Sequence, residues 1–175
     1  LEEIKYKANI YTGVKSDSFL EEGWQIITLE RLFKNFFGES LYLSIYKIAD
    51  HEERLVFLVN QVERMTGLKD FGIYLNKLFT IDAFFLNEDR HMHNIAVLMN
   101  GNGEFKYCPI FDNGAALLAD TTMDYPLDED VYKLMGQVKA KTICTNFDEQ
   151  LDVAERMYGV NITFSFNEKD VCEIL

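Results

Sequence analysis

The sequence predicts a mostly α-helical fold that carries one β-hairpin. Apolar residues recur at helical spacing along most of the chain. The pattern changes to short strand-like runs between residues 95 and 110. With 175 residues, of which 48% are hydrophobic, the chain can bury one core. We therefore expect a single domain over residues 1–175, with an irregular segment over residues 1–23.

Helices account for most of the expected structure. The sequence predicts them over residues 24–37, 51–65, 70–86 and 147–158, with weaker candidates over residues 128–136 and 167–174. Asp50 stands where a helix N-cap belongs, and Gly38 and Gly159 stand where helices end. The apolar segment 41–48 is too short to decide between helix and strand.

The β-hairpin is expected where the apolar pattern changes. Two runs, Ile95–Met99 and Phe105–Ile110, flank the glycine-rich turn Asn100–Gly103. The small residues Gly114–Ala116 then predict the start of a short helix, and residues 119–126 predict a polar loop. The hairpin is therefore the one β element expected in this chain.

Charge and composition exclude several classes of protein. The net charge of -12 disfavours nucleic acid and anionic membrane surfaces as partners, because both attract clustered Lys and Arg. No apolar run approaches the roughly 20 residues of a membrane span, and no secretory signal is evident. We therefore expect a cytoplasmic protein.

The residues that indicate a function lie on both sides of the hairpin. Asp89 and Asn94 precede it, and Asp112 opens the sequence Asp-Asn-Gly after it. The hairpin carries the chain out and back, so we expect Asp112 to return beside Asn94. Gly114 is expected to give the backbone the freedom to turn Asp112 inward. Two carboxylates and an amide oxygen would then surround one small volume, which suits a hard cation such as Mg²⁺ or Mn²⁺.

Simpler interpretations of this region stay open. The first Asp and the Asn, taken alone, could be a helix end and a turn, where both residues are common. His91 and His93, with Cys108 or Asp112, could instead bind zinc. However, two histidines at positions i and i+2 point apart, and no third strong ligand follows at a standard spacing. The three cysteines are odd in number and widely spaced, so we expect free, buried thiols.

The chain resembles the HipA-like family of bacterial kinases in three segments. The first is Asp-Arg-His-x-x-Asn over residues 89–94, a form that the phosphatidylinositol 3-kinases and 4-kinases share. The second is Pro-Ile-Phe-Asp-Asn-Gly over residues 109–114. The third comprises Ala-Lys-Thr over residues 140–142 and Asn-Phe-Asp-Glu-Gln-Leu over residues 146–151. Ordinary protein kinases place His and Arg before the Asp, and this chain does not.

This resemblance implies a fold, a reaction and a set of site residues. The fold would be the helical carboxy-terminal lobe of a protein kinase, and the reaction would be transfer of the γ-phosphoryl group of ATP to a Ser or Thr hydroxyl. Asp89 would be the catalytic carboxylate, with His91 orienting its loop. ATP would lie against Asp89, Asn94 and Asp112. Asn94 and Asp112 would hold the Mg²⁺ or Mn²⁺ ions. Arg90 would pair with a nearby carboxylate.

The chain departs from the family before the motif. Only 88 residues precede Asp89, and they lack the pattern of a multi-stranded lobe that covers the phosphates of ATP. The chain could therefore be an isolated lobe, could receive the other lobe from a partner protein, or could have lost activity. An inactive or split kinase that acts through protein contacts is thus a second hypothesis. A lipid or small-molecule kinase is a third, because it would use the same metal chemistry.

Overall fold

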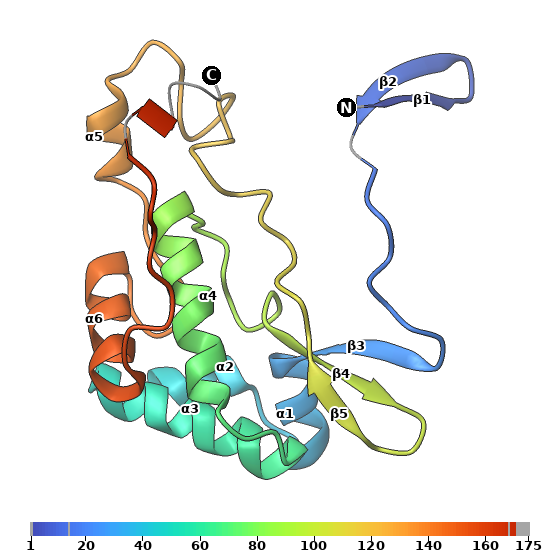
Figure 1. Ribbon diagram of the computed structural model, residues 1–175, viewed down its shortest axis with the longest axis vertical. Helices are drawn as coiled ribbons and strands as arrows, with labels where there is room; N and C mark the ends of the chain where they lie inside the picture. Colours follow the sequence, from blue (N-terminus) through green and yellow to red (C-terminus); the bar gives the residue numbers. More distant parts are fainter. Residues whose placement is uncertain (1, 14, 168, 171–175) are drawn as a thin grey trace.

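The protein has a mixed α/β fold. The computed structural model describes residues 2–13, 15–167 and 169–170. Helices take up 39% of the structure and strands 14%, and the strands form two small antiparallel sheets. The prediction of a mostly α-helical fold with a single hairpin is therefore wrong, because three further strands accompany the helices: two form a second hairpin and one extends the predicted hairpin (Figure 1).

The helices agree closely with the sequence pattern from residue 29 onward. They are α1 (Leu29–Phe37), α2 (Leu41–Tyr46), α3 (His51–Thr66), α4 (Phe71–Phe85), α5 (Val131–Met135) and α6 (Phe147–Tyr158). Asp50 caps α3 by accepting a hydrogen bond from the Glu53 N–H, and Gly38 ends α1 in the left-handed conformation. The short segment left open between helix and strand is α2. No helix in the described ranges combines the length and apolar character that a membrane span requires.

Residues 24–28 form a strand where the sequence predicts a helix. This strand, β3 (Trp24–Thr28), pairs in antiparallel fashion with β4 (Ala96–Asn100), so that Ile27 lies opposite Val97. Trp24 packs against the small cluster around Ala96 and Cys108, whereas Ile27 enters the main core. The side chains thus alternate between two faces, which is the period of a strand and not of a helix.

The predicted β-hairpin is present and forms the rest of this sheet. It joins β4 to β5 (Phe105–Tyr107), in the order β3-β4-β5. The Asn100 side-chain oxygen accepts hydrogen bonds from the N–H groups of Asn102 and Glu104, which closes the turn. Gly103 takes the left-handed conformation at φ 78°. The hairpin therefore returns the chain as predicted, although β5 ends at Tyr107.

A second hairpin lies in the segment that was expected to be irregular. It pairs β1 (Glu2–Tyr6) with β2 (Asn9–Gly13) and extends away from the helices (Figure 1). Almost all of its residues are exposed, including Ile4 and Ile10. Ile4, Tyr6, Ala8 and Ile10 alternate with polar residues as in a strand, but the turn at Lys7 and Ala8 has none of the residues typical of a hairpin turn, so the sequence does not indicate this hairpin.

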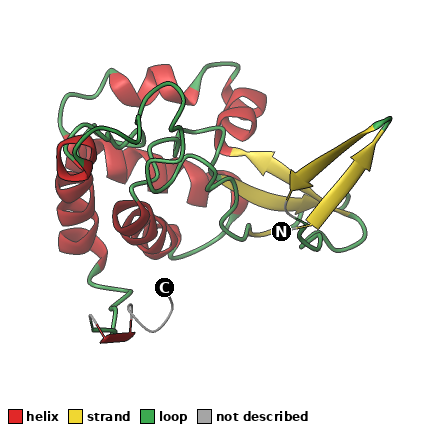
Figure 2. Cartoon of the chain, turned by 90° about the horizontal axis from the view of Figure 1, so that it is seen from above, coloured by secondary structure: helices red, strands yellow, loops and turns green. Residues whose placement is uncertain are grey.

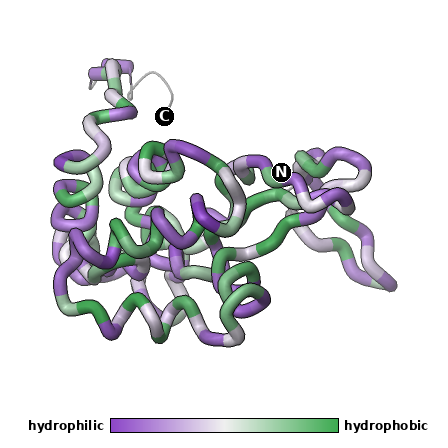
Figure 3. Tube along the Cα trace, turned by 90° about the horizontal axis from the view of Figure 1, so that it is seen from below, coloured by the Kyte–Doolittle hydropathy of each residue, from purple (hydrophilic) through white to green (hydrophobic). Residues whose placement is uncertain are grey.

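The main core lies between the helices and the inner face of the three-stranded sheet. It joins α1, α3, α4 and α6 with β3 and β4. Seen from above, the helices gather on one side and the strands on the other (Figure 2). Hydrophilic and hydrophobic residues alternate along the helices, as expected when each helix buries one face (Figure 3). Gly72 permits the close approach of α4 and α6, because a Cβ atom there would lie 2.2 Å from the Tyr158 ring.

Three smaller expectations have different outcomes. Residues 114–116 form turns and not the short helix that was expected. Cys108 and Cys144 are free and buried, which confirms that part of the cysteine prediction, while Cys172 lies outside the described residues. The helix candidate over residues 167–174 also falls largely outside the described residues.

Candidate functional site

The candidate site begins where α4 ends. Leu86 takes the left-handed conformation at φ 52°, so the chain leaves the helix sharply and enters the loop that carries Asp89 and Asn94. Asp82, in the last turn of the helix, points back to this loop. Its carboxylate accepts a 2.8 Å hydrogen bond from the Asn87 side chain. The end of α4 therefore both starts the loop and anchors it.

A buried ion pair holds the loop in place. Arg90 donates from Nε to both carboxylate oxygens of Asp82, at 3.2 and 3.0 Å, and from Nη2 to Oδ1 at 3.0 Å. Both side chains are only 1% exposed. Burial raises the pKa of the Asp82 carboxyl, and the hydrogen bonds from Arg90 and Asn87 oppose that shift. The prediction that Arg90 pairs with a carboxylate is thus confirmed, with Asp82 as its partner.

The same guanidinium group connects the two halves of the sequence motif. Nη1 of Arg90 donates to the Asn94 carbonyl at 2.8 Å and to the Phe111 carbonyl at 2.7 Å. Nη2 donates to the side-chain oxygen of Asn113. Phe111 and Asn113 are the two neighbours of Asp112, so one buried side chain fixes the segment around Asp112 against the backbone of Asn94. This contact holds together the two segments that flank the hairpin.

Asp89 presents a carboxylate that is held but accessible. Nδ2 of Asn94 donates to its Oδ2 at 3.1 Å and to its carbonyl at 2.9 Å. On the other oxygen, His91 Nε2 lies 3.6 Å away and Lys141 Nζ lies 3.8 Å away. The Asp89 side chain is 40% exposed. A substrate hydroxyl can therefore reach this carboxylate, and the neighbouring side chains restrict its orientation.

Asn94 and Asp112 keep oxygen atoms available. Asn94 is buried, and its amide nitrogen binds Asp89, but its side-chain oxygen makes no hydrogen bond to any residue that the structure describes. Asp112 is exposed, and its carboxylate likewise has no hydrogen bond or ion pair within the described ranges. One amide oxygen and one carboxylate with free lone pairs are the type of ligands that Mg²⁺ and Mn²⁺ prefer.

The backbone at Asp112 corrects one expectation. Asp112 itself takes the left-handed conformation at φ 56°, whereas Gly114 has no positive φ. Freedom at Gly114 is therefore not what directs Asp112. A non-glycine residue in this region of φ is uncommon, and surrounding contacts must hold it there. The hydrogen bonds from Arg90 to Phe111 and Asn113 supply contacts of this kind on both sides.

An open pocket of about 460 Å³ lies beside Asp89. Lys141 lines it together with the acidic residues Glu88, Asp120 and Asp124. The Tyr125 hydroxyl donates a 2.7 Å hydrogen bond to Glu88, and burial together with this acidic neighbour raises the pKa of Tyr125. The pocket therefore has negative charge around one lysine that stands next to the candidate catalytic carboxylate.

Three residues of this site were not identified from the sequence as functional. Asp82 shares the apolar stripe of its helix, and a carboxylate on a buried face is the signal that could have marked it. Lys141 and Thr142 belong to the segment quoted for the resemblance, without an assigned role. The Thr142 hydroxyl donates a 2.6 Å hydrogen bond to the Arg90 carbonyl, which brings this distant segment onto the loop.

The alternative zinc interpretation gains no support from the geometry. The rings of His91 and His93 are nearly perpendicular, with centroids 5.6 Å apart, and Cys108 is buried in a separate apolar cluster. Within the described residues, the three potential metal ligands that converge are instead His51, Cys144 and Glu149.

No protein-family model, curated protein or solved structure matches this chain. Its function is therefore inferred from the site itself.

Proposed function

We propose that the chain is part of a HipA-like phosphotransferase, which transfers the γ-phosphoryl group of ATP to a Ser or Thr hydroxyl of a protein. The observation that carries this proposal is the position of Arg90. Its guanidinium joins the Asn94 carbonyl to the carbonyl before Asp112, and so unites the two oxygen-bearing loops that such chemistry requires. A helix end or a turn needs no connection of this kind.

Asp89 acts on the acceptor in this proposal. Its carboxylate accepts a hydrogen bond from the substrate hydroxyl and orients the oxygen for in-line attack. Asn94 keeps the carboxylate in place through the 3.1 Å hydrogen bond to Oδ2. The other oxygen, Oδ1, faces His91 and Lys141 at distances of more than 3.5 Å, so a hydroxyl group can approach it.

The residues present fit a divalent ion. The Asn94 side-chain oxygen and the Asp112 carboxylate would hold Mg²⁺ or Mn²⁺, because both have free lone pairs and lie in segments that Arg90 holds together. When bound, such an ion neutralises the charge that develops on the transferred phosphoryl group. Arg90 contributes indirectly, because its hydrogen bonds within the described residues all go to protein groups. These hydrogen bonds hold the segment around Asp112 against the segment around Asn94.

The pocket beside Asp89 favours a basic acceptor segment. Lys141 is half-exposed and can attract a phosphate oxygen close to Asp89. Glu88, Asp120 and Asp124 place negative charge around the same opening. These carboxylates would repel an acidic peptide and attract Lys or Arg near the acceptor hydroxyl. We therefore expect protein substrates with basic residues beside the phosphorylated Ser or Thr.

Phosphate incorporation from γ-labelled ATP tests this proposal. Asp89→Ala and Asp112→Ala should each abolish incorporation into a basic acceptor protein, because they remove the catalytic carboxylate and a metal ligand. Asp152→Ala is the matched control, since Asp152 is an exposed carboxylate on α6, away from the pocket. Incorporation that persists in either site variant would show that these roles are wrong.

The exposed hairpin favours a second candidate function, that of a protein-binding module. Ile4, Tyr6, Ile10 and Tyr11 are each about half exposed or more on β1 and β2, and a partner chain could cover them. Affinity capture from the native host would compare wild type with Ile4→Ser/Ile10→Ser. Capture of a partner by the wild-type protein alone supports this function, and equal capture by both contradicts it.

A further inference from the structure

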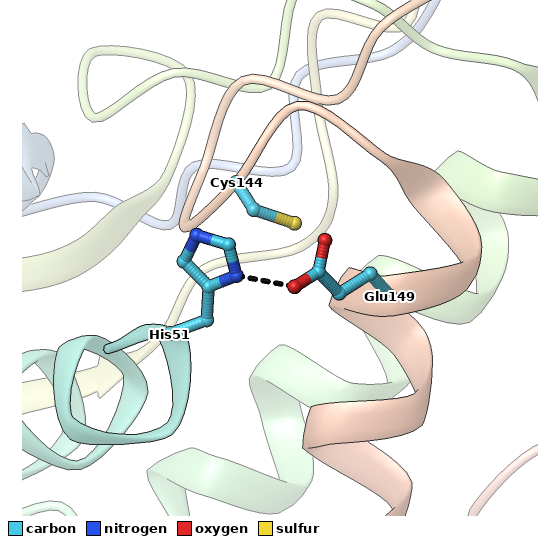
Figure 4. A group of neighbouring side chains, drawn as sticks. All are labelled: His51, Cys144 and Glu149. Carbon is cyan, nitrogen blue, oxygen red and sulfur yellow. Dashed lines mark hydrogen bonds and ion pairs between the residues drawn. The ribbon is translucent and has the colours of Figure 1, made fainter. Parts of the chain in front are cut away.

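Three potential metal ligands from separate segments meet at the loop 141–146. His51 is the first residue of α3, Glu149 lies in the first turn of α6, and Cys144 belongs to the loop before α6. The imidazole Nδ1 of His51 and a carboxylate oxygen of Glu149 are 2.6 Å apart. One ligand atom from each of the three residues lies within 4.8 Å of the others, and the side chains point toward one another (Figure 4).

We propose that His51, Cys144 and Glu149 form a binding site for a transition-metal ion of the zinc class. Sulfur, imidazole nitrogen and carboxylate oxygen are the three ligand types that zinc accepts in proteins. Mg²⁺ and Ca²⁺ prefer sites made only of oxygen, so the sulfur and nitrogen select against them. This site is thus chemically different from the oxygen ligands of Asn94 and Asp112, and it does not depend on the proposed phosphotransfer.

The spacing of the three atoms allows tetrahedral coordination after a small adjustment. Bonds of about 2.0–2.3 Å to zinc place two ligand atoms of a tetrahedron about 3.3–3.8 Å apart. The 2.6 Å hydrogen bond between His51 and Glu149 must therefore widen by about 0.8 Å to accept the ion. Glu149 can make that movement, because its side chain is 52% exposed.

The site is closed at the sulfur and open at the carboxylate. Cys144 is 3% exposed, whereas the His51 side chain is 30% and the Glu149 side chain 52% exposed. An ion can therefore enter from the solvent side and reach a sulfur that the protein interior keeps fixed. Three protein ligands leave a fourth tetrahedral position for water or for a group from a partner.

Hydrogen bonds hold the backbone around the ligands before any ion binds. Beside Cys144, the Ile143 N–H donates a 3.1 Å hydrogen bond to the Gln150 side chain. The Ile143 carbonyl accepts a 2.7 Å hydrogen bond from Arg54. Burial raises the pKa of the Cys144 thiol, and the charge of Arg54 opposes that shift. The Glu149 N–H donates to the Asn146 side chain, which caps α6. The Cys144 thiol donates a 3.2 Å hydrogen bond to the Asn146 carbonyl, and it must give up this bond and its proton when it binds the ion.

Metal binding here would reach the candidate active site. Cys144 follows Thr142 by two residues, and the Thr142 hydroxyl binds the Arg90 carbonyl at 2.6 Å. An ion on Cys144 therefore fixes the segment that packs against the Asp89 loop, and it also joins the beginnings of α3 and α6. Because such an ion binds the folded protein, it should raise the unfolding temperature.

Titration of the reduced, untagged full chain with Co²⁺ tests the site. Cobalt accepts the same ligands as zinc, and a thiolate bound to it gives a charge-transfer band in the near ultraviolet. We expect one equivalent to produce this band and Zn²⁺, but not Mg²⁺, to remove it. Cys144→Ser should lose the band. Glu149→Gln should weaken metal binding by at least about 10–100-fold, which is the typical effect of changing a residue that only supports a metal ligand.

Two controls keep the result interpretable. Cys108→Ser changes the other described thiol, which lies in a different cluster, and it should retain the band. Glu149→Gln changes an exposed side chain, so it reports on the site even if Cys144→Ser fails to fold. Absence of the band in the wild-type protein would overturn the proposal and leave His51 and Glu149 as a simple ion pair. A band that persists in folded Cys144→Ser would overturn it as well.

Discussion

The substitution Arg90→Lys separates the charge of Arg90 from its geometry. Lysine keeps the positive charge that Asp82 requires, but its single ammonium group cannot reproduce the planar fork of a guanidinium. In the native protein this fork reaches the carboxylate of Asp82 and the carbonyls of Asn94 and Phe111 at the same time. A lysine that stays on Asp82 must leave both carbonyls without their donor. We expect the segment around Asp112 to lose its connection to Asn94.

The magnitude follows from the contacts that are lost. A hydrogen bond from a charged group contributes about 1.5–3 kcal/mol, so two such bonds represent about 3 kcal/mol at the lower limit. Complete removal of the cation, as in Arg90→Ala, would in addition leave the carboxylate of Asp82 buried and unpaired, which adds about 3–5 kcal/mol to the loss. Since domains unfold with about 5–15 kcal/mol, Arg90→Lys should still fold.

Urea unfolding followed by circular dichroism measures this loss, and calorimetry with ATP and Mg²⁺ measures its effect on the site. We expect Arg90→Lys to lower the free energy of unfolding by about 3 kcal/mol and to abolish nucleotide binding. Arg156→Lys is the control, because Arg156 forms an exposed pair with Glu52 at 3.2 Å and should change stability by less than about 0.5 kcal/mol. A loss below about 1 kcal/mol for Arg90→Lys, with binding intact, would refute the reasoning.

Three further changes have defined outcomes. Gly72→Ala should lower the free energy of unfolding by about 1–3 kcal/mol, because its Cβ would meet the Tyr158 ring and force α4 and α6 apart. Burial raises the pKa of the Cys108 thiol from 9.0 to about 11. Between these two pH values the thiol loses its proton in the unfolded chain but keeps it in the folded protein, so the free energy of unfolding should fall as the pH rises. The fall should be less steep in Cys108→Ala. Lys141→Met should reduce phosphate incorporation about 10–100-fold without changing the unfolding temperature, because it removes a charged donor from the open pocket.

Each of these changes has a control and a contradicting result. Gly101→Ala introduces a Cβ with no atom within 4 Å, so a loss of stability equal to that of Gly72→Ala would show that the clash is not the cause. A pH profile that is identical in wild type and Cys108→Ala would exclude Cys108 as a contributor. Lys139→Met alters a nearby exposed lysine, and an equal loss of incorporation in both lysine variants would assign the effect to net charge.

The sequence predicts the parts of the fold that have a clear apolar period. α3 and α6 begin within one residue of the predicted starts, because Asp50 and Asn146 cap them and each buries one face. The hairpin β4–β5 follows from its turn, where Gly103 takes a positive φ. In these elements local sequence and tertiary packing favour the same structure, so the pattern is sufficient.

The errors arise where a tertiary contact decides the structure. Residues 24–28 contain apolar side chains that suit either period, and pairing with β4 selects the strand. The β1–β2 hairpin turns at Lys7 and Ala8, which are not typical turn residues, so the alternation of Ile4, Tyr6 and Ile10 with polar residues does not identify it. For the site, the spacing of Asp89, Asn94 and Asp112 predicts that the segments on either side of the hairpin return to each other, but not that Arg90 and Asp82 hold those segments together. In the sequence, this buried ion pair is visible only as one charged residue, Asp82, on the apolar stripe of its helix.

Calorimetric titration of ATP in the presence of Mg²⁺ or Mn²⁺ tests the central claim most directly. The claim is that Asn94 and Asp112 form a metal-dependent nucleotide site next to Asp89. We predict binding that requires the metal, that Asp112→Ala eliminates and that the exposed control Asp152→Ala retains. Absence of binding at millimolar nucleotide, or binding that Asp112→Ala leaves unchanged, would contradict this account of the site.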